Sequence, residues 1–234
     1  MQLSKKQMKF ILILSLLLNS INAFSQEKDI DTYFFFLGTL SDYMGRQKCS
    51  IELDKVDNYY KFESSLMEYN YGFLKNKYPD LSIDRTLNIL KSNKLASEIN
   101  KNFKYEFNEG FCSDNTDQYG NLKDSIFVGK LKLGIFKTEK QKLSYIVGAY
   151  TRYGDTNDKN YCIRIANSIS TFPICVKLLK QLGCKKVRTK VIKALPYNYV
   201  IYFEPSKDLE EFLLKYRFLI RKSDNSDLKS MPKN

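Results

Sequence analysis

The spacing of apolar residues changes along the chain, and this change sets the expected fold class. Between Asp29 and about Tyr105, apolar residues recur every three or four positions, as in amphipathic helices. From residue 125 onward they alternate with polar residues, as in half-buried strands. We therefore expect an α+β protein. Its expected parts are a helical N-terminal region (26–120), an α/β sheet domain (121–222) and a flexible polar tail (223–234).

Three helices are expected in the N-terminal region. The first runs from Asp29, as its cap, to Gly45, which stops it. The second covers about 56–78, and Pro79 closes it. The third begins at Ser82 and reaches Phe103. The segment 108–120 is rich in Gly, Asn and Asp, which predicts a loop and a domain boundary.

The C-terminal region is expected to alternate between strands and helices. Strands over 125–136 and 142–152 form a hairpin in this interpretation, and a third strand covers 161–166. A helix starts at Ser168 or Ser170 and stops at Gly183. The remaining elements are strands at 185–193 and 198–204 and a helix opened by Pro205-Ser206. This order predicts a ferredoxin-like, split-βαβ sheet, antiparallel or mixed, with helices on one face.

The first 25 residues have the pattern of a secretory signal peptide. Lys5, Lys6 and Lys9 precede a nine-residue apolar run, and small residues follow at Ala23 and Ser25. A membrane-spanning helix needs about 20 apolar residues, roughly twice this run. We therefore expect export to the periplasm or outside the cell, with no transmembrane segment after signal cleavage.

Composition removes most familiar enzyme mechanisms. The chain has 0 His, which excludes Ser-His-Asp and Cys-His nucleophile systems and every His-ligated metal. It also lacks a P-loop and a dinucleotide-binding glycine motif. We expect no catalytic residue, no metal and no cofactor. The alternative is a carboxylate-based glycan hydrolase, for which the acids of one polar loop are the candidates: Glu106, Glu109, Asp114 and Asp117.

The cysteine count allows two interpretations. The five residues are Cys49, Cys112, Cys162, Cys175 and Cys184. Export permits disulfides, and Cys49–Cys112 and Cys162–Cys184 are the pairs that stay within one half of the chain. All five as reduced core residues is the other interpretation. Cys175 lies between Ile174 and Val176 and is expected to be a buried, inert thiol.

Charge is distributed unevenly along the chain. The whole protein has 38 Lys+Arg and 26 Asp+Glu, a net charge of +12. Residues 26–120 hold 12 basic and 16 acidic residues, whereas residues 121–234 hold 23 and 10. Between Asp158 and Glu204 there are nine basic residues and no acid. Such a cationic stretch is typical either of a solvated face or of a surface that attracts anions.

Strand alternation places several of these cations together. Lys186, Arg188 and Lys190 are expected on one side of the strand over 185–193, because side chains alternate between faces. The same parity adds Arg164 and Tyr202 from the neighbouring strands, and Lys193 completes the candidate binding set. The expected ligand is cell-wall peptidoglycan, another anionic polymer or an acidic protein. Export argues against nucleic acid, and the sequence carries no signal for the oligomeric state.

Part of this region resembles a known family. The segments YCIRIANS, KLLKQLGCKKV and YNYVIYFEPSKDLEEFLLKYRFL, within Tyr161–Leu219, are similar to the SPOR family of exported peptidoglycan-binding domains. The two turns that precede its helices lack the glycines that the family commonly has there. The resemblance implies glycan binding across the sheet face, through Arg164 and the row of Lys186, Arg188 and Lys190. We therefore expect an exported, non-enzymatic binding protein, and a protein-partner module without a polyanion ligand is a further alternative.

Overall fold

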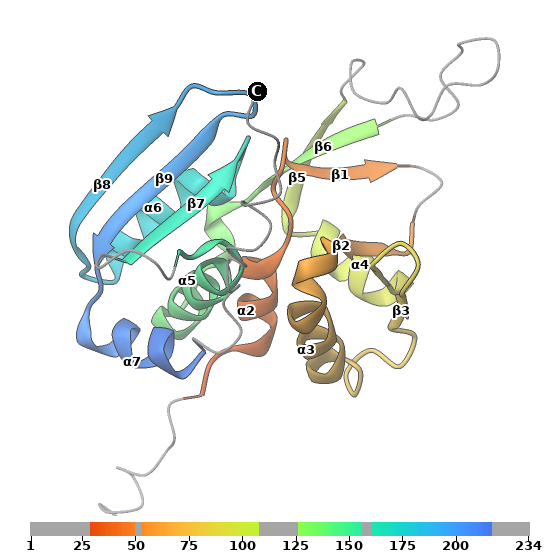
Figure 1. Cartoon of the computed structure of the whole chain (residues 1–234). Helices are drawn as coiled ribbons and strands as arrows, with labels where there is room; N and C mark the ends of the chain where they lie inside the picture. The colour runs from red at the N-terminus through yellow and green to blue at the C-terminus, as the bar shows by residue number, and fades with distance from the viewer. Residues whose placement is uncertain (1–28, 50–52, 108–125, 156–160, 217–234) are drawn as a thin grey trace, which may run out of the picture. The chain divides into compact units, whose positions relative to one another are not determined.

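The computed structural model describes residues 29–49, 53–107, 126–155 and 161–216. The chain divides into Met1–Ile30 and a compact unit that begins at Asp31. Within the described residues, six α-helices accompany nine strands in three antiparallel sheets, so the α+β class is confirmed (Figure 1). The expected signal peptide, the loop over 108–120 and the tail over 223–234 lie outside these residues. No helix in the described part is long and apolar enough to cross a membrane.

Helices α2 (Thr32–Thr39) and α5 (Glu139–Tyr153) form the centre of the unit and lie side by side in Figure 1. The carboxylate of Asp31 caps α2 by accepting hydrogen bonds from the backbone N–H groups of its first turn. The helices approach closely at two glycines. A Cβ atom at Gly38 would overlap the carbonyl oxygen of Tyr145, and one at Gly148 would overlap that of Phe35.

The expectation of a strand over 142–152 is wrong, because these residues belong to α5. A capping box between Thr138 and Gln141 starts the helix. Every residue from Leu143 to Arg152 is buried. A helix that is buried on all sides has no polar face, so its apolar run lacks the helical period and is easily taken for a strand.

Two of the three sheets are built largely from the N-terminal region. In one sheet β6 lies between β1 and β5, and in the other β4 lies between β2 and β3. Their strands are β1 (Arg46–Cys49), β2 (Lys55–Asn58), β3 (Ser82–Asp84), β4 (Ile89–Lys91), β5 (Phe103–Phe107) and β6 (Ile126–Leu131). The helical elements beside them are η1 (Lys61–Glu63), α3 (Ser64–Leu74), α4 (Asn93–Asn100) and η3 (Leu133–Ile135).

The expectation of a purely helical region over 26–120 therefore needs correction. The third expected helix is interrupted by a β3–β4 hairpin, in which Asn88 adopts φ 53° and the carboxylate of Asp84 accepts two turn N–H groups. Helix α4 begins only after Ser92, whose hydroxyl accepts the N–H of Leu95. Beyond the expected boundary, β6 pairs with β1 and β5. The two expected regions thus share a sheet.

The third sheet contains only the last three of the five expected strands, so the ferredoxin-like detail of the expected fold is not confirmed. Strand β9 (Asn198–Glu204) lies between β7 (Tyr161–Ala166) and β8 (Lys185–Ile192) and pairs antiparallel with both. Helix α6 (Thr171–Gln181) connects β7 to β8, and α7 (Lys207–Lys215) follows β9. Gly183 adopts φ 72° directly after Leu182, the C-cap of α6, which confirms it as the stop signal.

The start of α6 is capped by a residue far away in the sequence. The buried carboxylate of Asp42 accepts hydrogen bonds from the backbone N–H groups of Ile169, Ser170 and Thr171, at 3.0, 2.9 and 2.8 Å. It also accepts the hydroxyl groups of Ser168 and Ser170. These bonds fix the connection between α2 and β1 to the beginning of α6.

Candidate functional site

The register of the third sheet brings four of the predicted residues to one face. Val200 of β9 lies opposite Arg164 on one side and Lys190 on the other. Two positions along, Tyr202 lies opposite Arg188. Residues opposite one another, and residues two apart, share a face. We call Arg164, Arg188, Lys190 and Tyr202 the basic face.

Helices cover the opposite face of this sheet. There, Ile163 and Ile201 are fully buried. The ring of Tyr150, from α5, lies 6.3 Å from that of Phe203, and the ring of Phe172, from α6, lies 5.0 Å from that of Tyr199. All three cations of the basic face are exposed. The rings that α5 and α6 contribute therefore lie on the side of the sheet opposite the basic face, although Val200 and Cys162, which share the basic face, are also fully buried.

Lys186 and Lys193 lie outside the regular strand pairing of this row. A bulge lies between Lys185, which pairs with Glu204, and Arg188, so β8 contains one extra residue there. Lys186 adopts φ 50°, and its Nζ lies 2.6 Å from a carboxylate oxygen of Glu204. Lys193 follows the end of β8. The bulge interrupts simple alternation at Lys186, and its ion-pair partner Glu204 lies two positions from Tyr202, on the same side of β9 as the basic face.

The cations of the basic face differ in their partners. Arg164 Nη2 lies 3.9 Å from a carboxylate oxygen of Asp155, and this pair is partly exposed. Within the described residues, neither Arg188 nor Lys190 has a carboxylate within 4.0 Å. From strand geometry, the Cα atoms of Arg188 and Lys190 lie about 7 Å apart, and the Cα atom of Lys190 lies about 10 Å from that of Arg164 across β9. The face thus offers exposed positive charges at separated positions of the sheet.

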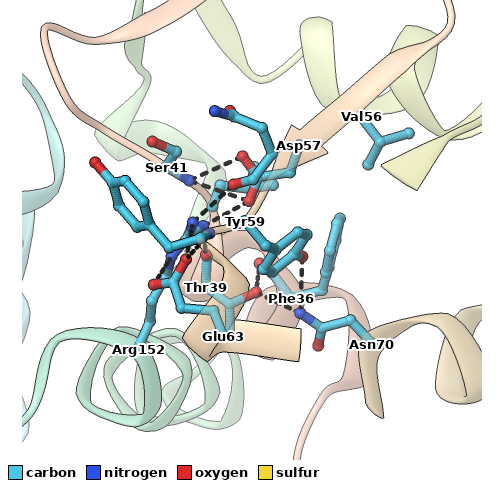
Figure 2. Close-up of polar contacts among 12 residues, drawn as sticks. Phe36, Thr39, Ser41, Val56, Asp57, Tyr59, Glu63, Asn70 and Arg152 are labelled. Atoms are coloured by element: carbon cyan, nitrogen blue, oxygen red, sulfur yellow. Dashed lines mark hydrogen bonds and ion pairs between the residues drawn. The ribbon is translucent and has the colours of Figure 1, made fainter. Parts of the chain in front are cut away.

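A second polar site lies at the C-terminal end of α5 and was not predicted from the sequence. We call Arg152, Asp57 and Glu63 the Arg152 cluster (Figure 2). The side chains of Arg152 and Asp57 are each only 3% exposed, and their ion pair measures 2.6 Å. Glu63 accepts two further bonds from the guanidinium at 3.1 and 3.0 Å.

All five N–H groups of the Arg152 guanidinium donate hydrogen bonds. Besides the two carboxylates, its Nη1 donates to the carbonyl oxygen of Thr39 at 2.6 Å, and its Nη2 donates to that of Asn58 at 2.8 Å. The ring of Tyr59 lies 4.8 Å from the guanidinium carbon. Arg152 therefore joins α5 to α2, β2 and η1, and has no donor left for a ligand.

Burial and charge act against each other in this cluster. Burial raises the pKa of Asp57 above its usual range, although Arg152 and Arg46 act in the opposite direction. Burial opposes the charge of Arg152, but Asp57, Tyr153 and Glu63 outweigh it and raise the pKa of Arg152 well above its usual range. A single arginine within the apolar run of α5 was the only sequence signal for this cluster.

The candidate catalytic loop gains no support from Glu106. Glu106 belongs to β5, and its carboxylate lies 2.8 Å from the Nζ of Lys130 and 3.7 Å from that of Lys104. The hydrogen bond from Lys130 lowers the pKa of Glu106. This is the state of a surface ion pair rather than of a general acid. Glu109, Asp114 and Asp117 lie outside the described residues.

One of the two disulfides considered from the sequence, Cys162–Cys184, is not formed. Cys162 and Cys184 are thiols in the structure and are not bridged to each other. Cys175 is fully buried, as expected, and burial raises the pKa of its thiol. Cys112 and the side chain of Cys49 lie outside the described part. In that part, no three Cys, Asp or Glu residues gather as metal ligands would.

Comparison with known proteins adds no relative. No protein-family model matches the chain, and no curated protein matches it significantly. The SPOR resemblance therefore depends only on the segments quoted above.

Proposed function

We propose that this protein is exported and binds an acidic cell-wall polymer through the basic face. The observation that carries this proposal is the shared face of Arg164, Arg188 and Lys190, fixed by the pairing of three strands. Three exposed cations whose strand positions lie about 7–10 Å apart suit repeated charges along a polymer better than a single small anion. Tyr202, half-buried beside Arg188, adds an amphipathic ring for a sugar unit.

Sheet topology and sequence both support a SPOR-like interpretation of this region. Strands β7 and β8 are both antiparallel to β9 and lie on either side of it, with α6 connecting them. A helix-connected strand pair separated by a third strand is the central feature of a ferredoxin-like unit. The N-terminal basic and apolar pattern supports export. The proposal assigns no catalytic residue.

The test is co-sedimentation of the purified protein with peptidoglycan sacculi at low and physiological salt. The test variant is Arg164→Gln/Arg188→Gln/Lys190→Gln. The matched control is Lys140→Gln/Lys177→Gln/Lys180→Gln, which removes the same charge from exposed positions on α5 and α6. Each exposed ion pair contributes about 0.5 kcal/mol, so the test variant should bind about tenfold more weakly.

The outcomes separate specific binding from general attraction. Pelleting that persists at physiological salt, is retained by the control and is weakened in the test variant supports the proposal. Equal losses in both variants, or pelleting that disappears at about 0.15 M salt, indicate attraction by net charge alone and contradict it. The intact mass of the exported protein tests removal of residues 1–25, and retention of those residues contradicts signal cleavage.

A further inference from the structure

A pocket of about 230 Å³ lies beside the Arg152 cluster, among β1, β2 and the chain that joins α2 to β1. It shares no residue with the basic face. Drug-sized ligands occupy pockets of about 300–1,000 Å³, so this pocket suits a smaller molecule. The side chains that carry the argument are Tyr43, Arg46, Gln47, Lys55, Asn58 and Tyr60. We call it the tyrosine pocket.

The lining of the tyrosine pocket has more positive than negative groups. It includes Arg46, Lys55 and Arg152 but only one carboxylate, that of Asp57. Asp57 is already matched by Arg152 at 2.6 Å, and it also accepts the N–H of Ser41 at 3.2 Å. These bonds hold the base of the pocket in place. Among the described residues, Arg46 is therefore the cation of the lining whose direct partners are left to examine.

Among the lining residues, Arg46 is the best candidate to bind an anion. The residue is 7% exposed. It donates to the carbonyl oxygen of Val56 at 2.8 Å and to the amide oxygen of Asn100 at 3.1 Å, with a long contact of 3.5 Å to the carbonyl oxygen of Lys55. All three partners are neutral, and a guanidinium has five N–H donors. No carboxylate of the described residues lies within 4.0 Å of it.

Burying a cation without a direct counter-ion costs desolvation free energy. A bound anion offsets that cost, so such a site favours an anionic ligand. A carboxylate suits a guanidinium best, because two parallel N–H groups can bind its two oxygens. The pocket thus offers one well-defined position for a carboxylate.

The mouth of the pocket has exposed aromatic rings. Tyr60 is 64% exposed, and its ring stacks on that of Phe62 with centroids 5.2 Å apart and planes at 16°. Tyr43, also in the lining, is 46% exposed. Stacking on Phe62 limits the motion of Tyr60, which lowers the entropy lost when a ligand contacts it. Two exposed tyrosines provide apolar surface and hydroxyl groups together.

We infer that the tyrosine pocket binds a small sugar acid, a hydroxylated ring with one carboxylate. The carboxylate lies on Arg46, and the ring contacts Tyr60 and Tyr43. Gln47 and Asn58 supply the amide donors and acceptors that hydroxyl groups need. The polar lining favours a hydroxylated ring over a hydrocarbon ring, because unmatched polar groups oppose an apolar ligand. This site is independent of the basic face.

Calorimetric titration with D-glucuronate tests the inference, with D-glucose and benzoate as comparison probes. We expect millimolar or tighter binding of glucuronate, and at least tenfold weaker binding of glucose and of benzoate. Arg46→Gln should weaken glucuronate binding at least tenfold. Because Arg46 is buried, Tyr60→Ser provides a second variant at an exposed position, and several-fold weaker binding is expected there.

Tyr197→Ser is the matched control, since Tyr197 is an exposed tyrosine outside the pocket. It should bind glucuronate as the wild type does. The inference is overturned if glucuronate releases no heat of binding, if glucose or benzoate binds equally well, or if Tyr60→Ser and Tyr197→Ser have the same effect. The basic-face triple variant should keep glucuronate binding, so failure of one proposal does not decide the other.

Discussion

Replacing Arg152 by Met should strongly destabilise the protein without changing the volume of the side chain greatly. The substitution removes the donor of all five bonds that join α5 to Asp57, Glu63 and two backbone carbonyl groups. Asp57, only 3% exposed, would remain as a buried carboxylate without its ion-pair partner. Removing one member of a buried pair typically costs about 3–5 kcal/mol.

The size of this effect can be measured by urea and thermal unfolding. For a chain of this length, about 4 kcal/mol corresponds to a fall in Tm of roughly 10 °C. Arg85→Met is the matched control, because Arg85 forms an ion pair with Glu68 in which its side chain is 71% exposed. That control should leave the unfolding midpoint within experimental error.

The pH dependence of the Arg152→Met variant identifies the cause. Burial already raises the pKa of Asp57, and loss of Arg152 removes the main group that opposes this shift. A carboxyl group with a higher pKa in the folded than in the unfolded state favours folding when it is protonated. The deficit relative to wild type should therefore shrink as pH falls through the folded-state pKa of Asp57. Asp57→Asn in the Arg152→Met background should recover part of the stability at neutral pH.

Two results would refute this reasoning. One is a loss of less than about 1 kcal/mol for Arg152→Met, which would place the cluster among weak surface pairs. The other is a large loss that neither low pH nor Asp57→Asn relieves, which would assign the effect to packing rather than to the uncompensated carboxylate.

Two further pairs of variants, each a test and its control, examine contacts of the fold. Gly148→Ala should destabilise by about 1–3 kcal/mol in urea unfolding, because its Cβ would overlap the backbone of α2, whereas Gly72→Ala, with open space in α3, should be neutral or stabilising. Equal effects at the two glycines would contradict the close approach of α2 and α5. Asp42→Ala should lower stability by about 2–3 kcal/mol, because it leaves buried N–H groups of α6 without an acceptor, and the exposed cap Thr138→Ala should lower it by about 1 kcal/mol. A smaller loss for Asp42→Ala than for Thr138→Ala would show that water replaces the Asp42 carboxylate.

The elements that the sequence predicted well are those with a local signal. Gly183 ends α6, and the turn around Pro196 separates β8 from β9, so the boundaries of these elements followed from turn chemistry. Strands β7 and β9 each have consecutive buried residues, Cys162 and Ile163 in one and Val200 and Ile201 in the other, so their burial does not alternate simply. Alternation along β8 predicts the shared face of Arg188 and Lys190, and parity on the neighbouring strand adds Arg164, as the observed register has them.

The failures occurred where tertiary contacts override the local pattern. Helix α5 is buried on every side, so its sequence has neither a polar face nor a helical period. Strands β2, β3 and β4 have three or four residues each, too few for alternation to be visible. The Arg152 cluster combines residues 57, 63 and 152, which only the folded chain brings together. At Lys186 a bulge interrupts the pairing that simple alternation assumes.

The bonds from Asp42 to the start of α6 have a consequence for how the chain folds. They close a loop of more than 120 residues, and the bond from Arg152 to Thr39 closes one of similar length. Closing such long loops costs chain entropy before the favourable energy of the contacts is gained. This cost slows folding and makes it more cooperative. A fragment that begins at residue 121 would lack the carboxylate that caps α6. The C-terminal sheet is therefore expected to refold only together with the N-terminal segment, supplied in the same chain or as a complementing fragment.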